Sequence, residues 1–231
     1  MTIGIIAALP EECRTLTTRA VNRQQPAWMA AGVCLLYSGV GSNQAESAAL
    51  RLLELGAEVI VSWGCAAGLA VDARPGQLLL TDTVIGSAGA LVSVDSALLH
   101  AWRSQLSDLA LIDGRLYSAD QLITQSAEKR RLHQATSANV LDMESFAIAQ
   151  VADAAAKPFI IVRAIADPWD MDLPGVVAGG MAPSGEVNAA RVALGALAKP
   201  WQIPSLIRLA RHFKQAQTVL TQAATALALS D

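Results

Sequence analysis

Two carboxylates in the second half of the chain, Glu144 and Asp167, each follow an apolar run with the composition of a buried strand. The first run, 139–141, is followed by a helical pattern of apolar residues, and Glu144 lies at that junction. The second run, 159–166, is rich in β-branched residues and ends directly at Asp167. A pair of carboxylates at one site is typical of general acid and base catalysis.

The order strand, helix, strand predicts a βαβ unit, whose two strands run parallel. Parallel strands place their carboxyl ends at one edge of the sheet, where ligands bind in open α/β folds, so we expect Glu144 and Asp167 at one mouth. Each acid also has a purely structural interpretation. The helix dipole stabilises an acid in the first turn by roughly 0.3–1 kcal/mol, and an aspartate before proline often begins a turn. Arg163, inside the second strand, is interpreted as a paired structural cation rather than a ligand.

Composition predicts one α/β domain over residues 1–231. The chain is 53% hydrophobic and only 16% charged, which is enough apolar material for a well-buried core. A formal net charge of -3 and an aromatic content of 4% give no basic, stacking surface of the kind that binds nucleic acid. We therefore expect no nucleic-acid partner.

The cysteines and histidines predict neither disulfides nor a metal site. Cys13, Cys34 and Cys65 are odd in number, widely spaced and without a CxxC pair, as in a reduced cytoplasmic protein. The three histidines show no ligand spacing. The first residues lack the basic start of a signal peptide, and the longest apolar run, about 59–71, is too short to span a bilayer. We expect a soluble, cytoplasmic chain.

Alternating elements predict a parallel, doubly wound core in the first third of the chain. We expect strands over 3–9, 33–38 and 59–63, and helices from Pro10 to about Ala20 and over 43–55. Further on we expect a strand of different orientation over 76–84, an extended segment over 109–117, and helices over 96–106, 126–135, 186–197 and 205–228.

Two C-terminal segments are expected to affect substrate access. The loop 171–184 is rich in Gly, Pro and Met and is long enough to form a lid. Its apolar side chains could line a channel for a large ligand: Met171, Leu173, Val176, Val177 and Met181. The helix 205–228 is amphipathic, with Arg208, Arg211, His212 and Lys214 away from its apolar face. It is expected to pack on its own domain; a transient membrane-surface contact is the alternative.

A dinucleotide cofactor is not expected. Gly39-Val40-Gly41 has the first part of a GxGxxG loop, but position 44 is Gln44 instead of the third glycine, and no acid ends the next strand. We predict no cofactor.

Five segments, in this order, resemble the purine nucleoside phosphorylase and nucleosidase superfamily: GIIAALPEE, SGVGSNQAESA, SWGCAAGL, LDMESFAIAQVA and VRAIAD. They span roughly residues 3–170 and are most similar to methylthioadenosine/S-adenosylhomocysteine nucleosidases and futalosine hydrolases. The segments ADPWDMDLP and PSLIRLARH resemble the hopanoid-associated phosphorylases, which are thought to remove adenine from adenosylhopane. The resemblance implies a three-layer α/β/α fold around a mixed, mostly parallel twisted sheet.

The resemblance also implies a role for each motif residue. Asp167 would protonate or hydrogen-bond purine N7, and Glu144 would hold the ribose hydroxyls. Met143 would pack on the sugar, and Glu12 would position the attacking water. The remaining substrate-binding positions would be Gly64, Cys65 and Ile123. These roles suit the chemistry, because a leaving purine needs a proton and an oxocarbenium-like sugar needs negative charge nearby.

Departures from the family pattern favour hydrolysis over phosphorolysis. Phosphorylases of the superfamily present an arginine in the first loop and another on the third strand to hold phosphate. Here those places carry Pro10, Glu11, Glu12 and Ser62. An unpaired Glu12 would repel phosphate and suits activation of water. Cys65 replaces the usual serine or threonine. A nucleoside-binding module that has lost turnover is the alternative from another class.

The implied partner is an adenine nucleoside with an apolar 5′ substituent. The C-terminal resemblance favours a lipid-linked substrate, adenosylhopane. The alternatives are phosphorolysis of the same bond, or a small water-soluble substrate such as methylthioadenosine, adenosylhomocysteine or futalosine. The resemblance also implies a homo-oligomer.

Overall fold

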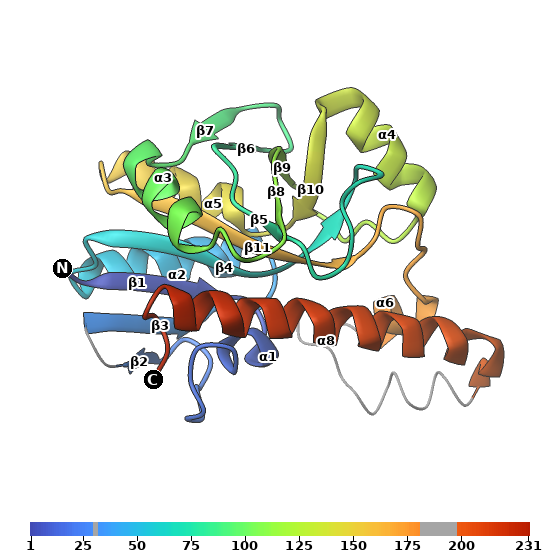
Figure 1. Ribbon diagram of the computed structural model, residues 1–231, viewed down its shortest axis with the longest axis horizontal. Helices are drawn as coiled ribbons and strands as arrows, with labels where there is room; N and C mark the ends of the chain where they lie inside the picture. Colours follow the sequence, from blue (N-terminus) through green and yellow to red (C-terminus); the bar gives the residue numbers. More distant parts are fainter. Residues whose placement is uncertain (30–31, 181–197) are drawn as a thin grey trace.

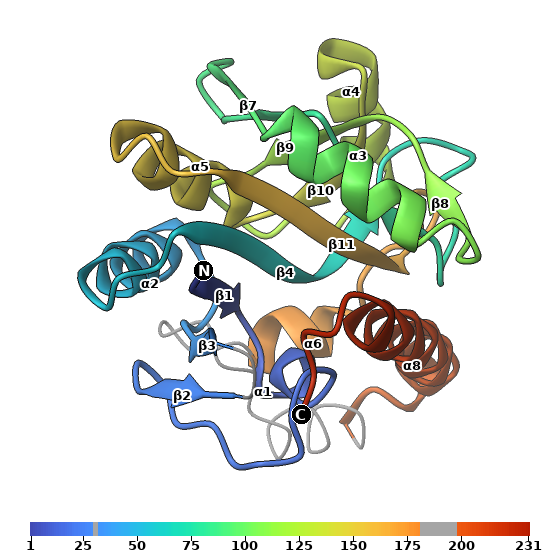
Figure 2. The same ribbon diagram turned by 60° about the vertical axis from the view of Figure 1, so that its left-hand side comes forward.

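The computed structural model describes residues 1–29, 32–180 and 198–231 (Figure 1). One twisted mixed sheet runs through these residues, with helices packed on both faces (Figure 2). This three-layer arrangement is the fold that the sequence predicts.

The first half of the sheet is parallel, as predicted. Its strands lie in the order β3-β1-β4-β11 and have the bounds β1 (Ile3–Ala7), β3 (Val33–Tyr37), β4 (Val59–Gly68) and β11 (Phe159–Asp167). A short edge strand that the sequence did not indicate, β2 (Pro26–Trp28), pairs antiparallel with β3. The buried strands are almost continuously apolar because helices cover both of their faces.

The second half of the sheet is made of shorter strands: β5 (Leu78–Leu79), β6 (Thr83–Ile85), β7 (Leu91–Ser93), β8 (Leu111–Ile112), β9 (Arg115–Ser118) and β10 (Ala138–Asp142). Thus the single strand predicted over 76–84 is two strands, and the extended segment 109–117 is also two. β5 runs antiparallel to β11, in agreement with the predicted change of orientation.

Strand β4 is longer than predicted, and this overturns the predicted βαβ unit. The expected strand ended at Trp63, but β4 continues through the small residues to Gly68. Its first half pairs parallel with β1, whereas its last two residues pair antiparallel with β10; β11 occupies the opposite edge. β10 and β11 are therefore not parallel neighbours. Instead, the carboxyl ends of β1 and β10 point toward each other beside the middle of β4.

The helices form two layers. One face of the sheet is covered by α2 (Ser42–Glu54) and α5 (Ser145–Ala154), and the other by α1 (Pro10–Cys13), α3 (Ser96–Gln105) and α8 (Ile203–Ala226). α4 (Ser126–Thr136) lies beside β10, and α6 (Gly175–Gly180) follows β11. The predicted helix 186–197 lies outside the described residues.

The first helix is shorter than the predicted Pro10–Ala20 because a threonine takes over its backbone contacts. Thr15 Oγ1 donates to the carbonyl of Glu12 at 2.6 Å and accepts the indole N–H of Trp63 at 2.9 Å. Both bonds draw Thr15 into the core, where it is 5% exposed. A hydroxyl that bonds to nearby backbone competes with helix continuation.

Helix α8 begins and ends within two residues of its predicted bounds. It lies along the sheet in Figure 1, and its second half packs on the core through Ala216, Leu220, Ala223 and Ala224. The beginning of α8 and the 3₁₀ turn before it are less covered, with Trp201 70% and Ile207 49% exposed. Among the described residues, no helix combines the length and apolar composition that crossing a bilayer requires.

Candidate active site

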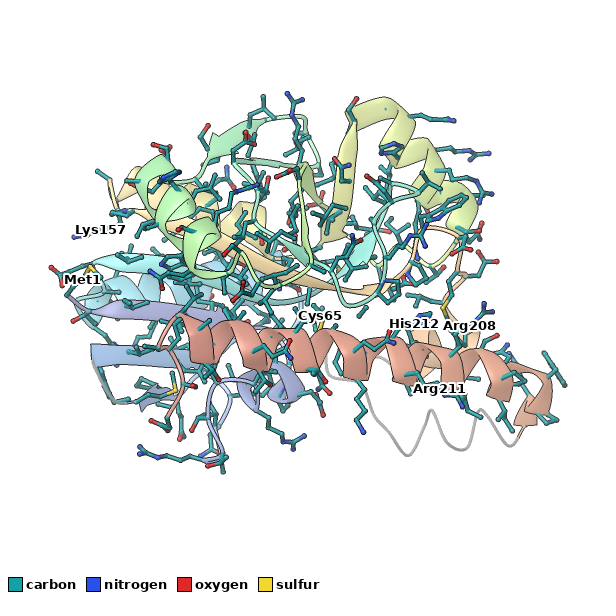
Figure 3. All side chains as sticks on the ribbon, in the orientation of Figure 1. Met1, Cys65, Lys157, Arg208, Arg211 and His212 are labelled. Atoms are coloured by element: carbon teal, nitrogen blue, oxygen red, sulfur yellow. The ribbon has the colours of Figure 1, made fainter. Side chains whose placement is uncertain are left out.

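A cavity of about 230 Å³ lies where the carboxyl ends of β1, β10 and β11 approach one another. Its lining includes six of the seven residues predicted for the site: Glu12, Cys65, Ile123, Met143, Glu144 and Asp167. The wall is otherwise mainly apolar and includes Leu9, Val40, Leu122, Leu173, Leu209 and Phe213. Leu209 and Phe213 come from α8, and Figure 3 shows Cys65 at the level of the middle of that helix.

Glu12 is buried at the base of this cavity and is held by backbone amides. Its Oε2 accepts the N–H groups of Ala8 at 2.9 Å and Leu9 at 3.0 Å, and its Oε1 accepts that of Cys65 at 2.7 Å. These bonds connect the loop after β1 to the middle of β4. Burial raises the pKa of Glu12, while the nearby Arg163 and these amides oppose that shift.

Glu144 occupies the N-cap position of α5, but its side chain does not cap that helix. Its Oε1 accepts the N–H of Gly41 at 2.9 Å, and its Oε2 lies 3.5 Å from Arg163 Nη2. Burial raises the pKa of Glu144 to about 7, with Arg163 opposing and Asp142 adding to the shift. Since its contacts are with the Gly41 loop and Arg163, the helix-dipole interpretation does not account for this acid.

Arg163 is a paired buried cation, as the sequence indicated, and it organises the acids of the cavity. Its Nη2 lies 2.7 Å from Asp142 Oδ2 and donates to Ser62 Oγ at 2.9 Å and Ser145 Oγ at 3.2 Å. Its Nη1 is buried and has no hydrogen-bond partner among the described residues. Nη2 of this guanidinium therefore makes the ion pair and the hydrogen bonds, whereas Nη1 keeps an unused N–H donor.

Gly64 does not line the cavity, but its missing side chain leaves room for Glu12 and Arg163. A Cβ at this position would lie 2.5 Å from both Arg163 Nη1 and Glu12 Oε1. Only the absence of a side chain allows these two groups to approach the β4 backbone. Cys65 follows Gly64 on β4, and its side chain is partly exposed.

Asp167 ends β11 at the opposite side of the cavity. Its Oδ2 lies 2.5 Å from Lys129 Nζ, whereas its Oδ1 is buried without a partner among the described residues. Burial raises the pKa of Asp167, and the Lys129 ammonium opposes that shift. A buried acceptor without a partner costs free energy unless a ligand or water satisfies it.

Lys129 was not predicted from the sequence. It lies in α4, within the polar run AEKRRLHQ, which reads as a solvent-exposed helix. One signal was present: Lys129 shares a helix face with Leu132 and His133, three and four residues on, and both are partly buried.

The channel predicted over 171–184 is corrected for the described residues. Leu173 lines the cavity, whereas Met171, Val176 and Val177 do not. Met181 lies outside the described residues.

The arrangement separates three carboxylates by environment. Glu12 is fixed by amides, Glu144 faces a guanidinium, and Asp167 faces an ammonium with one oxygen left over. Such differences suit distinct roles, because acids in different surroundings titrate at different pH. The cavity thus combines an Asp167 oxygen without a partner among the described residues, a Glu144 carboxyl beside a guanidinium, and a Glu12 carboxyl held by backbone amides.

The chain is similar in fold to solved nucleosidases. Futalosine hydrolase of Helicobacter pylori strain 26695 superposes with a TM-score of 0.72 at 16% identity, covering 99% of this chain and 97% of that one. The 5′-methylthioadenosine/S-adenosylhomocysteine nucleosidase from Neisseria meningitidis, in complex with methylthio-immucillin-A, gives 0.73 at 19% identity, covering 98% of both chains. S-adenosylhomocysteine nucleosidase from Streptococcus pyogenes, with 5-methylthiotubericidin, gives 0.70 at 20% identity, covering 98% and 96%.

A family model described as "Phosphorylase superfamily" matches residues 2–198. The matched range contains β1, β4, β10 and β11 and every acid of the cavity. It confirms the superfamily and the enzyme class that the motifs indicated. The chain belongs to the phosphorylase superfamily.

Proposed function

We propose that this protein hydrolyses the N-glycosidic bond of an adenine nucleoside and releases the base. The observation that carries this proposal is that Glu12, Glu144 and Asp167 line one cavity of about 230 Å³ in three different environments. The cavity is deep enough in the molecule that all three are buried, with exposures of 2%, 6% and 7%.

Asp167 is the proposed acid at the base. Asp167 lines the cavity, and its Oδ1 is buried without a partner among the described residues. Burial raises the pKa of Asp167 and so favours its protonated form. A protonated Oδ1 can donate to purine N7 as the glycosidic bond breaks. General acid catalysis of this kind typically contributes 10²–10⁴-fold.

Glu144 is the proposed partner of the ribose hydroxyls. The Gly41 amide and Arg163 hold its carboxylate in place, and Met143 lies beside it in the cavity wall. A charge-assisted hydrogen bond from a hydroxyl is worth about 1.5–3 kcal/mol. Since the pKa of Glu144 is about 7, its ionised form predominates above that pH, and this negative charge would stabilise an oxocarbenium-like sugar.

Glu12 and Arg163 are the proposed holders of the attacking water. Arg163 Nη1 has no hydrogen-bond partner among the described residues. Nη1 and Glu12 Oε1 would both lie 2.5 Å from a Cβ on Gly64, so the two groups face the same small space. A water between them could donate to the carboxylate and accept from the guanidinium. Glu12 would then take the proton as the water attacks the sugar.

The charges around Arg163 support hydrolysis rather than phosphorolysis. Asp142, Glu144 and Glu12 all act on this one guanidinium. Ser62, which replaces the strand arginine of phosphorylases, is fully buried beneath Arg163. A phosphate dianion entering here would meet more negative than positive charge, and it would be repelled.

The 5′ substituent is proposed to be apolar, because Leu9, Val40, Leu209 and Phe213 line the cavity. A lipid-linked nucleoside of the adenosylhopane type remains our preferred substrate on the sequence of the C-terminal third. Exposed Trp201 and Ile207 would suit a transient contact with a membrane surface. The solved structures of similar fold favour the second candidate, a small nucleoside such as methylthioadenosine, adenosylhomocysteine or futalosine.

Two further properties complete the proposal. We expect a homo-oligomer, which sedimentation velocity would detect. We also expect a reducing, cytoplasmic setting, since the three cysteines are free thiols.

The decisive experiment supplies methylthioadenosine, adenosylhomocysteine, futalosine and an adenine nucleoside with a long apolar 5′ chain, each with and without phosphate. Free base and free sugar are expected, at a rate that phosphate leaves unchanged. A sugar 1-phosphate product would show phosphorolysis.

Glu12→Gln should abolish base release while nucleoside affinity stays within about 2-fold, because its proposed partner is water. Preference for methylthioadenosine, without binding to vesicles that carry the lipid substrate, would contradict the lipid-linked candidate.

A further inference from the structure

Lys129 is a fully buried lysine whose ammonium contacts the acid at the end of β11. Its side chain is 0% exposed, and Nζ lies 2.5 Å from Asp167 Oδ2. Nζ also donates to the carbonyl oxygens of Pro168 and Met171, each at 3.0 Å. An ammonium has three N–H donors, and these three oxygens account for all of them. Lysine is almost never fully buried unless it is paired in this way.

These contacts determine which oxygen of Asp167 is left for a ligand. Lys129 occupies Oδ2, and Oδ1 stays buried without a partner among the described residues. Asp167 lines the cavity, whereas Lys129 is not part of its wall. Of the three residues that Lys129 Nζ contacts, Asp167 is the one that lines the cavity, so a direct effect of the ammonium on a bound nucleoside would be carried by Asp167.

We propose that Lys129 is a positioning residue for glycosidic cleavage, which holds Asp167 with Oδ1 toward the base and balances the carboxylate that remains after proton transfer. This inference rests on the proposed function. In the step, the Oδ1–H bond breaks and an N7–H bond forms. The C1′–N9 bond breaks with its electron pair moving into the purine. The oxygen of the attacking water forms the new bond to C1′, and its proton passes to Glu12. Lys129 keeps all of its protons.

Opposing effects of burial and charge explain why this acid needs a cation. Burial raises the pKa of Asp167, and Lys129 lowers it; Asp170 and Asp172, in the loop after β11, raise it further. Burial lowers the pKa of Lys129, and the same three acids raise it. Without the ammonium, Asp167 would hold its proton to a higher pH but would be a weaker acid, because its conjugate base would be buried and uncompensated.

A merely structural role is the alternative, in which Lys129 only ties α4 to the loop after β11. The two roles predict different pH profiles of kcat, because a purely structural contact between α4 and the loop would not set the pKa of Asp167. In Lys129→Met we expect kcat to fall by about 10-fold or more. We expect KM to stay within about 2-fold of the wild-type value. The alkaline limb of the kcat profile should move up by about one pH unit or more, because a nearby cation lowers the pKa of an aspartate by about 1–3 units.

Arg130→Met is the matched control. Arg130 is exposed, follows Lys129 in α4, and lies 5.9 Å from the ring centre of Trp169 in the same loop. The Arg130→Met variant removes a cation and a loop contact but no contact with Asp167. The alkaline limb of its kcat profile should therefore stay at the wild-type pH. Should Lys129→Met fail to fold, Lys129→Gln keeps two N–H donors without the charge and is expected to give the same shift.

A double-mutant cycle tests whether Lys129 acts through Asp167. In the background of Asp167→Asn, Lys129→Met should change kcat by less than about 2-fold, because the charge that it balances is gone. An unchanged alkaline limb in both Lys129 variants, or a full additional loss in the Asp167→Asn background, would overturn the proposal.

The wild type in the same assay separates this inference from the proposed function. If the wild type releases no base from any nucleoside of the panel, the proposed function is wrong. The contact is then read from the carboxyl ¹³C titration of Asp167, whose pKa should be higher in Lys129→Met than in the wild type. No increase would overturn the role of Lys129 in either case.

Discussion

Arg163 Nη2 lies 2.7 Å from Asp142 Oδ2, and both side chains are only 1% exposed. The guanidinium thus balances the buried carboxylate of Asp142 and also faces Glu144, and both of these acids line the cavity. Removing one partner of a buried ion pair leaves an uncompensated charge, which typically costs 3–5 kcal/mol. We predict a loss of that size for Arg163→Met, measured by urea unfolding at pH 7.

The control for this prediction is Arg51→Met. Arg51 pairs with Glu54 at 2.7 Å on the surface of α2, where both side chains are more than half exposed. An exposed pair contributes about 0–1 kcal/mol. Equal losses in the two variants would contradict the organising role given to Arg163.

Stability should depend on the protonation of Glu144. The pKa of this acid is raised from 4.5 to about 7, so the folded protein keeps a proton that the unfolded chain releases. Its contribution to stability is fully present below about pH 4.5 and is lost as the pH rises through about 7. The loss is at most about 3.5 kcal/mol, since one pKa unit corresponds to about 1.4 kcal/mol.

The measurement is the free energy of unfolding in urea between pH 4 and 8. Glu144→Gln should flatten the decline, because glutamine cannot release a proton. Glu54→Gln, at an exposed acid of α2, should leave it unchanged. If the free energy of unfolding of Glu144→Gln declined with pH as much as that of the wild type, another buried acid near Arg163 would be responsible for the decline.

Asp167→Asn should lower turnover by ~10²-fold or more and leave nucleoside binding largely intact, because an amide cannot act as the acid. Base release and calorimetric affinity measure the two effects. Asp108→Asn is the control: Asp108 is an exposed aspartate in the turn after α3, and it does not line the cavity. Near wild-type turnover in Asp167→Asn would remove the acid assignment.

Gly64→Ala should reduce turnover by about 10²-fold, because displacing a reacting group by about 1 Å can cost that much. The new Cβ would lie 2.5 Å from both Glu12 Oε1 and Arg163 Nη1, and backbone amides hold Glu12 in place. Gly175→Ala is the control, since the nearest atom to its Cβ would be Gln202 Nε2 at 3.9 Å. Rates are compared on folded protein, with melting temperatures as a check.

The parallel core could be predicted from the sequence because its signals are local: apolar runs gave β1, β3 and β11. Glu144 and Asp167 were singled out because each comes at the end of such a run, and both line the cavity. Glu12 lines it too, but it was indicated only by the family resemblance. In those three strands each residue type agrees with the local geometry and with burial on both faces.

Two features could not be predicted in this way because long-range contacts determine them. The segment GCAAG after Trp63 has the composition of a loop, yet pairing with β11 and β10 makes it a strand. Lys129 belongs to a polar helix, and only the position of Asp167, 38 residues away in sequence, explains its burial. Tertiary context overrides local preference at both places.

Strand β4 also couples formation of the cavity to folding of the whole sheet. Its backbone bonds to β1, β10 and β11, and Ile60 pairs with Phe159, roughly a hundred residues away. Pairings of such large sequence separation slow folding, since a long loop must close first. Once formed, the β4 amides lie on a ladder that no local fraying can open, so their hydrogen exchange should require nearly global unfolding. The cavity built along this strand should therefore form only together with the whole sheet, and we expect no partly folded chain to bring Glu12 and Asp167 together.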